Sequence, residues 1–165
     1  MDYQSAEGER LRDRLFVAID PNFQPVRQLR FEFPRQQLQA VRLVQTAPSG
    51  ARDIWAMTEM RLFDGAGEIP ATPAWKLRAS DAPWALPLAF DGNPATRWRA
   101  WQWLRQGMWV SVELPREAAL TTVAVDATSD HYAAQLKLEG LTSGGWKELA
   151  SEPKVTGLEI GRAHV

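Results

Sequence analysis

The sequence predicts an all-β sandwich, and three observations indicate this fold class. Stretches in which apolar and polar residues alternate recur along most of the chain, as in strands with one buried face. Clusters rich in Gly, Pro, Asn and Asp separate these stretches. The chain has 165 residues, 45% of them hydrophobic, which suffices for one domain with a substantial core. Many short strands at this spacing favour an antiparallel sandwich or jelly roll.

The first half of the chain holds four strand candidates, at residues 15–19, 27–33, 38–46 and 54–63. The last of these alternates clearly. It places Ile54, Ala56, Thr58, Met60 and Leu62 on one face and Trp55, Met57, Glu59, Arg61 and Phe63 on the other.

Four more strand candidates follow, at residues 108–114, 120–127, 134–140 and 145–150. In the first of them Met108, Val110, Val112 and Leu114 are expected to face inward. Helical character is limited to residues 7–15, which form too short a segment to be stable alone.

Composition excludes several classes of function. The formal net charge is −1 and no block of like charge occurs, so nucleic acid and anionic lipid are not expected partners. No apolar run approaches the roughly 20 residues of a membrane span, and the N-terminal residues lack the apolar segment of a signal peptide. The chain has no cysteine, so it forms no disulfide and its redox compartment stays open.

An ordered set of motifs spans about residues 74–150. It consists of APWALPLAFDGNPATRWRAW (82–101), GMWVSVELPREAALTTVAVD (107–126) and LKLEGLTSGGWKELA (136–150). This set resembles the discoidin or coagulation-factor 5/8 type C family. The resemblance implies a galactose-binding-like jelly roll that serves as a carbohydrate-binding module outside the cytoplasm. One departure is that VELP stands where the family usually has an Asp-Leu-Gly corner.

The order of the motifs is unusual for that family. Residues 55–63 resemble its closing strand, yet they precede the Asp-Gly-Asn turn. The chain is therefore expected to be incomplete or permuted. Either residues 1–66 end one module and residues 74–158 begin the next, or the whole chain is one sandwich with permuted strands.

The final seven residues, Glu159–Val165, are what a common sequencing-adapter sequence encodes. We expect this segment not to be biological, and we exclude its His164 from every site.

The turn around Asp91, Asn93 and Thr96 permits two interpretations. Short oxygen side chains on a tight loop suit Ca²⁺, which takes about six to eight oxygen ligands. The resemblance adds Glu59, because some relatives complete a structural calcium shell with a Glu from the closing strand. The alternative is an Asx-turn without metal, in which Asp91 accepts backbone N–H groups and Thr96 caps the loop.

The candidate ligand site follows that turn. Phe90 and Trp98 are expected in the core. The indoles beyond them, near planar polar side chains, suit the apolar and hydroxyl faces of a sugar. The predicted sugar-binding set is Trp84, Arg99, Trp101, Gln102, Trp103 and Arg105, with Trp84 added because family ligand sites lie on loops at one end of the sandwich. The alternative is that these indoles pack against an adjacent module of the same polypeptide.

Catalytic patterns are absent from the sequence. Ser129, Asp130 and His131 are consecutive, and neighbouring residues of a strand point to opposite faces, so they are not a triad. We expect a non-catalytic module that binds a glycan or another cell-surface component. A structural spacer that binds no sugar is the alternative.

Overall fold

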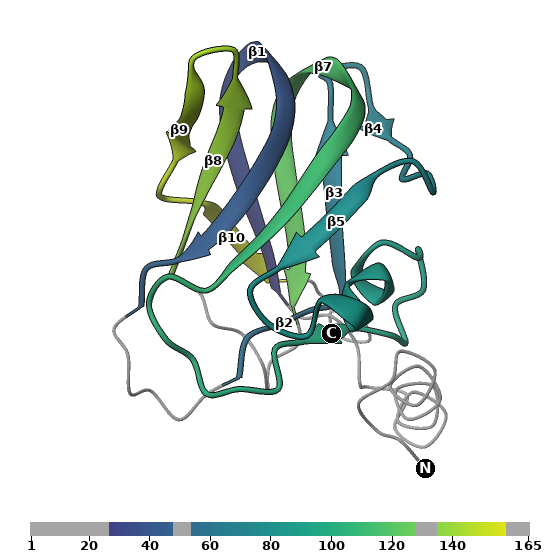
Figure 1. Ribbon diagram of the computed structural model, residues 1–165, viewed down its shortest axis with the longest axis vertical. Helices are drawn as coiled ribbons and strands as arrows, with labels where there is room; N and C mark the ends of the chain where they lie inside the picture. The colour runs from purple at the N-terminus through teal and green to yellow at the C-terminus, as the bar shows by residue number, and fades with distance from the viewer. Residues whose placement is uncertain (1–26, 48–53, 128–134, 158–165) are drawn as a thin grey trace.

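The computed structural model describes residues 27–47, 54–127 and 135–157, which form an antiparallel β-sandwich of two layers (Figure 1). The all-β prediction is confirmed at this level, while the jelly-roll assignment stays a prediction. The strand expected at 15–19, the helix expected at 7–15, residues 129–131 and the segment 159–165 lie outside the described residues.

Two long strands dominate the fold. β1 (Arg27–Gln45) and β7 (Trp109–Ala127) each have 19 residues and pair with each other from Arg27–Ala127 to Val44–Trp109. Both bend over the upper end of the molecule (Figure 1). The sequence predicted two separate strands in each of these regions, which is wrong. Pro34 and two register shifts interrupt the alternation within β1, but the chain stays in the sheet.

Because β1 and β7 bend, each contributes one half to each layer. The first layer contains β5 (Lys76–Ala79), the first half of β7, the second half of β1, β8 (Leu136–Thr142) and β9 (Gly145–Ala150), in this order. The second layer contains β4 (Glu68–Ile69), β3 (Glu59–Phe63), the second half of β7, the first half of β1 and β10 (Lys154–Gly157).

Strands from both predicted halves of the chain thus belong to one sheet, since β1 and β3 come from the region 1–66 and β7 from 74–158. This pairing is compatible with a permuted single domain and with packing between parts of tandem modules. The two alternatives for the domain organisation stay predictions.

The core lies between the layers, and the inward residues predicted for 108–114 are confirmed. Met108, Val110, Val112 and Leu114 are all buried. The segment 54–63 is not one alternating strand as predicted. It breaks at Thr58 into β2 (Ala56–Met57) and β3, and every side chain from Trp55 to Met60 is buried.

The lower end of the sandwich, at the bottom of Figure 1, is closed by aromatic side chains. β2 pairs with β6 (Trp98–Arg99), and the rings of Trp55 and Trp98 meet edge to face with centroids 5.0 Å apart. The indole N–H of Trp98 donates to the carbonyl oxygen of Ala82 at 3.1 Å. The prediction that Trp98 is a core residue is confirmed, with 1% of it exposed.

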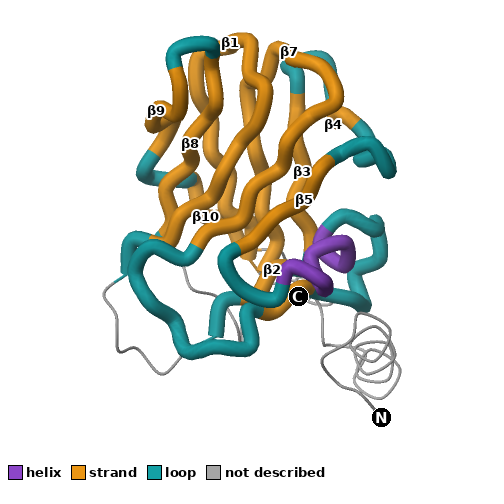
Figure 2. The backbone as a smooth tube through the Cα atoms, in the orientation of Figure 1, coloured by secondary structure: helices purple, strands orange, loops and turns teal. Residues whose placement is uncertain are grey.

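A 3₁₀ helix, η1 (Pro83–Ala89), also lies at this end (Figure 2). The sequence pattern predicted no helix here. Pro83 begins the helix, where a missing N–H costs nothing. Its closely spaced apolar residues, Ala85, Leu86, Leu88 and Ala89, are buried. Such a short run carries too little periodicity to distinguish a helical turn from a strand.

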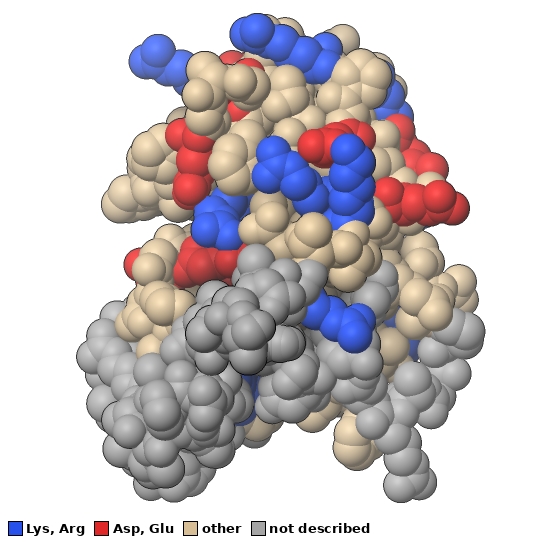
Figure 3. All heavy atoms as spheres, turned by 180° about the vertical axis from the view of Figure 1, so that it is seen from behind, with Lys and Arg blue, Asp and Glu red and all other residues tan. Residues whose placement is uncertain are grey.

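Charged side chains of both signs are interspersed on the face opposite that of Figure 1 (Figure 3). In the second layer, Glu32 pairs with Arg30 and with Lys154, and Arg61 pairs with Asp126. The opposite charges within these pairs therefore neutralise each other locally.

Gly140 provides a test of the packing between β8 and the core. A Cβ at this position would lie 2.7 Å from Cδ2 of the buried Leu38 and 2.8 Å from Cδ1 of Leu149. We expect Gly140→Ala to lower the free energy of unfolding by about 1–2 kcal/mol in urea titrations, because a packed core resists added volume. Gly67→Ala is the control, since no heavy atom lies within 4 Å of its Cβ position. Equal stability of the two variants would contradict this packing.

Candidate functional site

The turn at Asp91 is held by its own side chains. The carboxylate of Asp91 accepts the backbone N–H of Asn93 at 3.0 Å and the hydroxyl of the buried Thr96 at 2.6 Å. The amide oxygen of Asn93 accepts the backbone N–H of Ala95 at 2.9 Å. Gly92 has a φ of +69°, which a residue with a Cβ rarely adopts. These contacts make an Asx-turn, the alternative that the sequence left open beside calcium.

Glu59 meets this turn from the start of β3. It is 9% exposed, and it lies within hydrogen-bond reach of Asp91 and of the backbone N–H of Gly92. Burial, the negative charge of Asp91 and the hydrogen bond with Asp91 raise the pKa of Glu59 to about 8, and Gly92 and Arg61 oppose this shift. Within the described residues, Oε1 of Glu59 has no hydrogen-bond partner.

The structure therefore brings together only part of the predicted calcium set, namely Glu59 and Asp91. The two carboxyl groups of Glu59 and Asp91, with one buried oxygen lacking a partner, fit a cation. Thr96 and the Asn93 amide are engaged inside the turn. Among the residues that the structure describes, no three acidic, His or Cys side chains gather as a metal group. Calcium binding stays a prediction.

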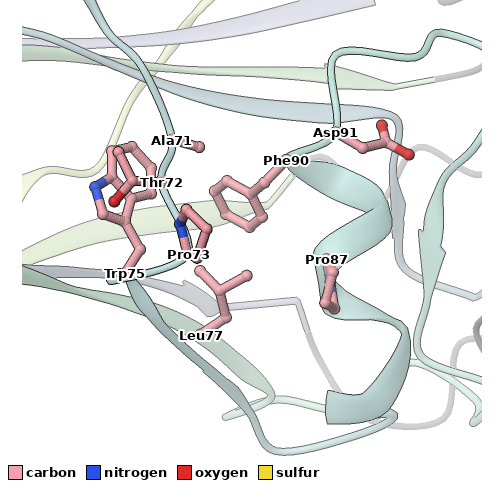
Figure 4. Close-up of a pocket in the computed structure, with 8 residues that line it drawn as sticks. All are labelled: Ala71, Thr72, Pro73, Trp75, Leu77, Pro87, Phe90 and Asp91. Atoms are coloured by element: carbon pink, nitrogen blue, oxygen red, sulfur yellow. The ribbon is translucent and has the colours of Figure 1, made fainter.

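A cleft opens beside the turn, and no pattern in the sequence predicted it. Its larger part, about 480 Å³, lies between the segment 71–77 and the end of η1 and includes Trp75, Leu77, Pro87 and Phe90 (Figure 4). Its smaller part, about 250 Å³, is lined by Glu59, Arg61 and Glu68, among others. Ala71, Trp75, Phe90 and Asp91 line both parts. We call the two parts together the aromatic cleft.

The rings of Trp75 and Phe90 meet edge to face in this cleft, with centroids 6.1 Å apart. Phe90 was predicted as a core residue, and it packs against the core while part of it stays accessible. Trp75 follows a run of Pro, Ala and Thr residues and precedes Lys76, so nothing in its neighbourhood predicted that it meets Phe90.

The predicted sugar-binding residues lie at the lower end of the sandwich. Trp84, in η1, is 48% exposed, and Trp103, in the loop between β6 and β7, is 61% exposed. Gln102 is exposed in the same loop. Arg105, also in this loop, forms an ion pair with Asp81 at 3.2 Å. The structure therefore places two indoles and two polar side chains in solvent at one end.

Arg99 and Trp101 differ from the expectation. Arg99 is only 6% exposed, because it lies in the buried strand β6. Its guanidinium carbon lies 5.5 Å from the centroid of the Trp101 ring. Trp101 has a φ of +60°, so the backbone is not extended there. The alternation of an extended strand, which would put Trp101 and Trp103 on the same face, therefore does not hold here. Trp101 is half-buried, whereas Trp103 points into solvent.

Comparisons with known proteins identify no relative. No family model, no curated protein and no solved structure matches the chain. The resemblance to the discoidin family stays a prediction that depends on the motifs of residues 74–150. In the described part of the chain, no helix combines the length and the apolar character that a membrane crossing needs.

The position of Glu59 predicts how stability depends on pH. Between pH 4.5 and about 8 the folded protein keeps a proton on Glu59 that the unfolded chain has released, so this contribution to stability falls as the pH rises. Glu59→Gln imitates the protonated form. We expect its free energy of unfolding, relative to the unsubstituted chain, to increase by about 1–3 kcal/mol between pH 5 and pH 8.

Urea titrations across this pH range measure the effect. Glu152→Gln, exposed between β9 and β10, is the matched control for the loss of a carboxyl group. A stability difference for Glu59→Gln that does not change with pH would show that Glu59 is not buried against Asp91.

Proposed function

We propose that the chain is a non-catalytic, carbohydrate-binding module of a larger protein that acts outside the cytoplasm and attaches it to a glycan or another cell-surface component. The exposure of Trp84 in η1 and of Trp103 in the loop before β7 carries this proposal, since η1 and this loop lie at the same end of the sandwich (Figure 2). An exposed indole is costly to leave in water, and its flat apolar face matches the C–H face of a pyranose ring.

Polar side chains beside these indoles support the same ligand class. Gln102 offers an amide to sugar hydroxyls, and Arg105 offers guanidinium donors that its ion pair with Asp81 holds in place. Arg99 and Trp101 have a supporting role in this proposal, because the stacking between them stabilises the loop that carries Trp103. The site on this proposal is a shallow platform on loops, which suits a chain end or a branch of a glycan.

The same exposure also suits a structural spacer, in which Trp84 and Trp103 pack against an adjacent module of the polypeptide. The two functions differ in the partner. A spacer binds no free sugar, and its indoles are buried only when the neighbouring module is present.

Glycan binding by the full chain distinguishes the two. On a glycan array and in titrations of the best ligand, we expect Trp103→Ala to weaken binding about tenfold, the loss of one stacking contact. Trp146→Ala is the control, because Trp146 is 38% exposed on β9, where it stacks on Arg42. Absence of any saturable binding by the folded chain, or equal binding by all three proteins, would contradict the proposal.

A further inference from the structure

We propose that the aromatic cleft is a binding site for a small organic ammonium ion with an apolar body, distinct from the proposed sugar platform. The cleft joins an acidic part, closed by Glu59, to an apolar part walled by aromatic side chains. Neither the calcium prediction nor the proposed carbohydrate function assigns a role to Trp75 or to the larger part of the cleft.

The acidic part selects for positive charge. Three acidic residues, Glu59, Glu68 and Asp91, line it together with a single basic residue, Arg61. The guanidinium of Arg61 forms an ion pair with Asp126, which belongs to β7 and does not line the cleft. The lining of the smaller part is therefore acidic on balance, and an anion is disfavoured there.

Glu59 supplies the specific contact. Oε1 lies in a side chain that is nine-tenths buried, and it has no hydrogen-bond partner among the described residues. A buried oxygen without a partner costs free energy. Oε1 is enclosed, so an N–H donor of a ligand recovers this free energy once the carboxyl group turns toward the cleft. An ammonium group carries three such donors and a charge, so it forms a charge-assisted bond to this oxygen.

The larger part of the cleft accounts for the apolar body. Figure 4 shows the side chains of Pro73, Leu77 and Phe90 turned toward one another, with Pro87 of η1 beyond them. A volume of about 480 Å³ is in the range of pockets that enclose small organic ligands. The ring faces of Trp75 and Phe90 also attract a cation.

These features favour an organic cation over a metal ion. A hard metal ion needs six or more oxygens and gains nothing from an apolar wall. The hydroxyl of Thr96 and the amide oxygen of Asn93, which a metal would need, are held inside the turn. An amine requires only one acceptor, which the carboxyl group of Glu59 offers when it turns toward the cleft, and the apolar surface next to it.

The test uses 2-phenylethylamine as the probe and 2-phenylethanol as its uncharged control. Resonances of the full chain are followed by ¹⁵N NMR as each compound is added to about 10 mM. We expect saturable shifts of the Gly92 amide and of the Trp75 indole N–H with the amine, and binding at least tenfold weaker with the alcohol. Calcium chloride is titrated separately.

Two variants locate the binding. Glu59→Gln removes the carboxyl group, which releases its proton when the ammonium ion binds. Ala71→Trp fills the cleft from an exposed position, so it does not disturb the core. We expect each to weaken amine binding at least tenfold, while the surface variant Glu152→Gln leaves it unchanged.

Four results would overturn the proposal: no saturable binding of the amine, equal binding of the alcohol, amine binding retained by both variants, or saturation of the site by calcium without any binding of the amine. None of these outcomes depends on glycan binding, so the two proposals fail separately.

Discussion

The pairing of β1 with β7 is the constraint on which the structure depends. Each of these strands bends from one layer into the other, so a single antiparallel ladder, from Arg27–Ala127 to Val44–Trp109, belongs to both layers. Every other strand of the large sheet attaches to this ladder directly or through one neighbour. β3, β5, β8 and β10 pair with it, and β4 and β9 pair with β3 and β8. The two layers are therefore covalently coupled, and we expect neither to form without the other.

The position of the aromatic cleft follows from this ladder. β3 pairs with the second half of β7, from Glu59–Asp126 to Phe63–Thr122, which fixes Glu59 at the lower end of the second layer. The Asp91 turn reaches the same place because Trp98 is locked against Trp55 and Ala82. Two carboxyl groups far apart in sequence thus face each other, at the cost of burying Glu59, and the raised pKa of Glu59 is the measure of that cost.

The sequence predicted those features that depend on local pattern. Alternation identified the inward residues Met108, Val110, Val112 and Leu114, and the burial of Trp98 followed from its size and its place beside a turn. Alternation failed where the backbone leaves the extended conformation, as at Thr58 and at Trp101 with its φ of +60°. It also failed to show that the strands continue through the bend, because bulges disturb the period without ending the pairing.

The candidate sites also contain features that the local sequence predicted and features that it did not. The polar residues around Trp103 predicted it as an exposed indole, and the resemblance added Trp84. The same reasoning placed Arg99 beside them, although Arg99 is buried in β6. The Trp75–Phe90 wall could not be predicted, because it depends on how the connection from β4 to β5 folds back onto η1. Contacts of this kind are set by tertiary packing and leave no period in the sequence.

Native-state hydrogen exchange tests the central claim, that one bent ladder couples the two layers into a single cooperative unit. The amides bonded between β1 and β7 around Leu43–Val110 lie in the first layer, and those around Phe31–Val123 lie in the second. The account predicts that both groups open with the same free energy, equal to that of global unfolding to within about 1 kcal/mol. If the amides of one layer exchange at a free energy several kcal/mol below that of the other layer, this claim is contradicted.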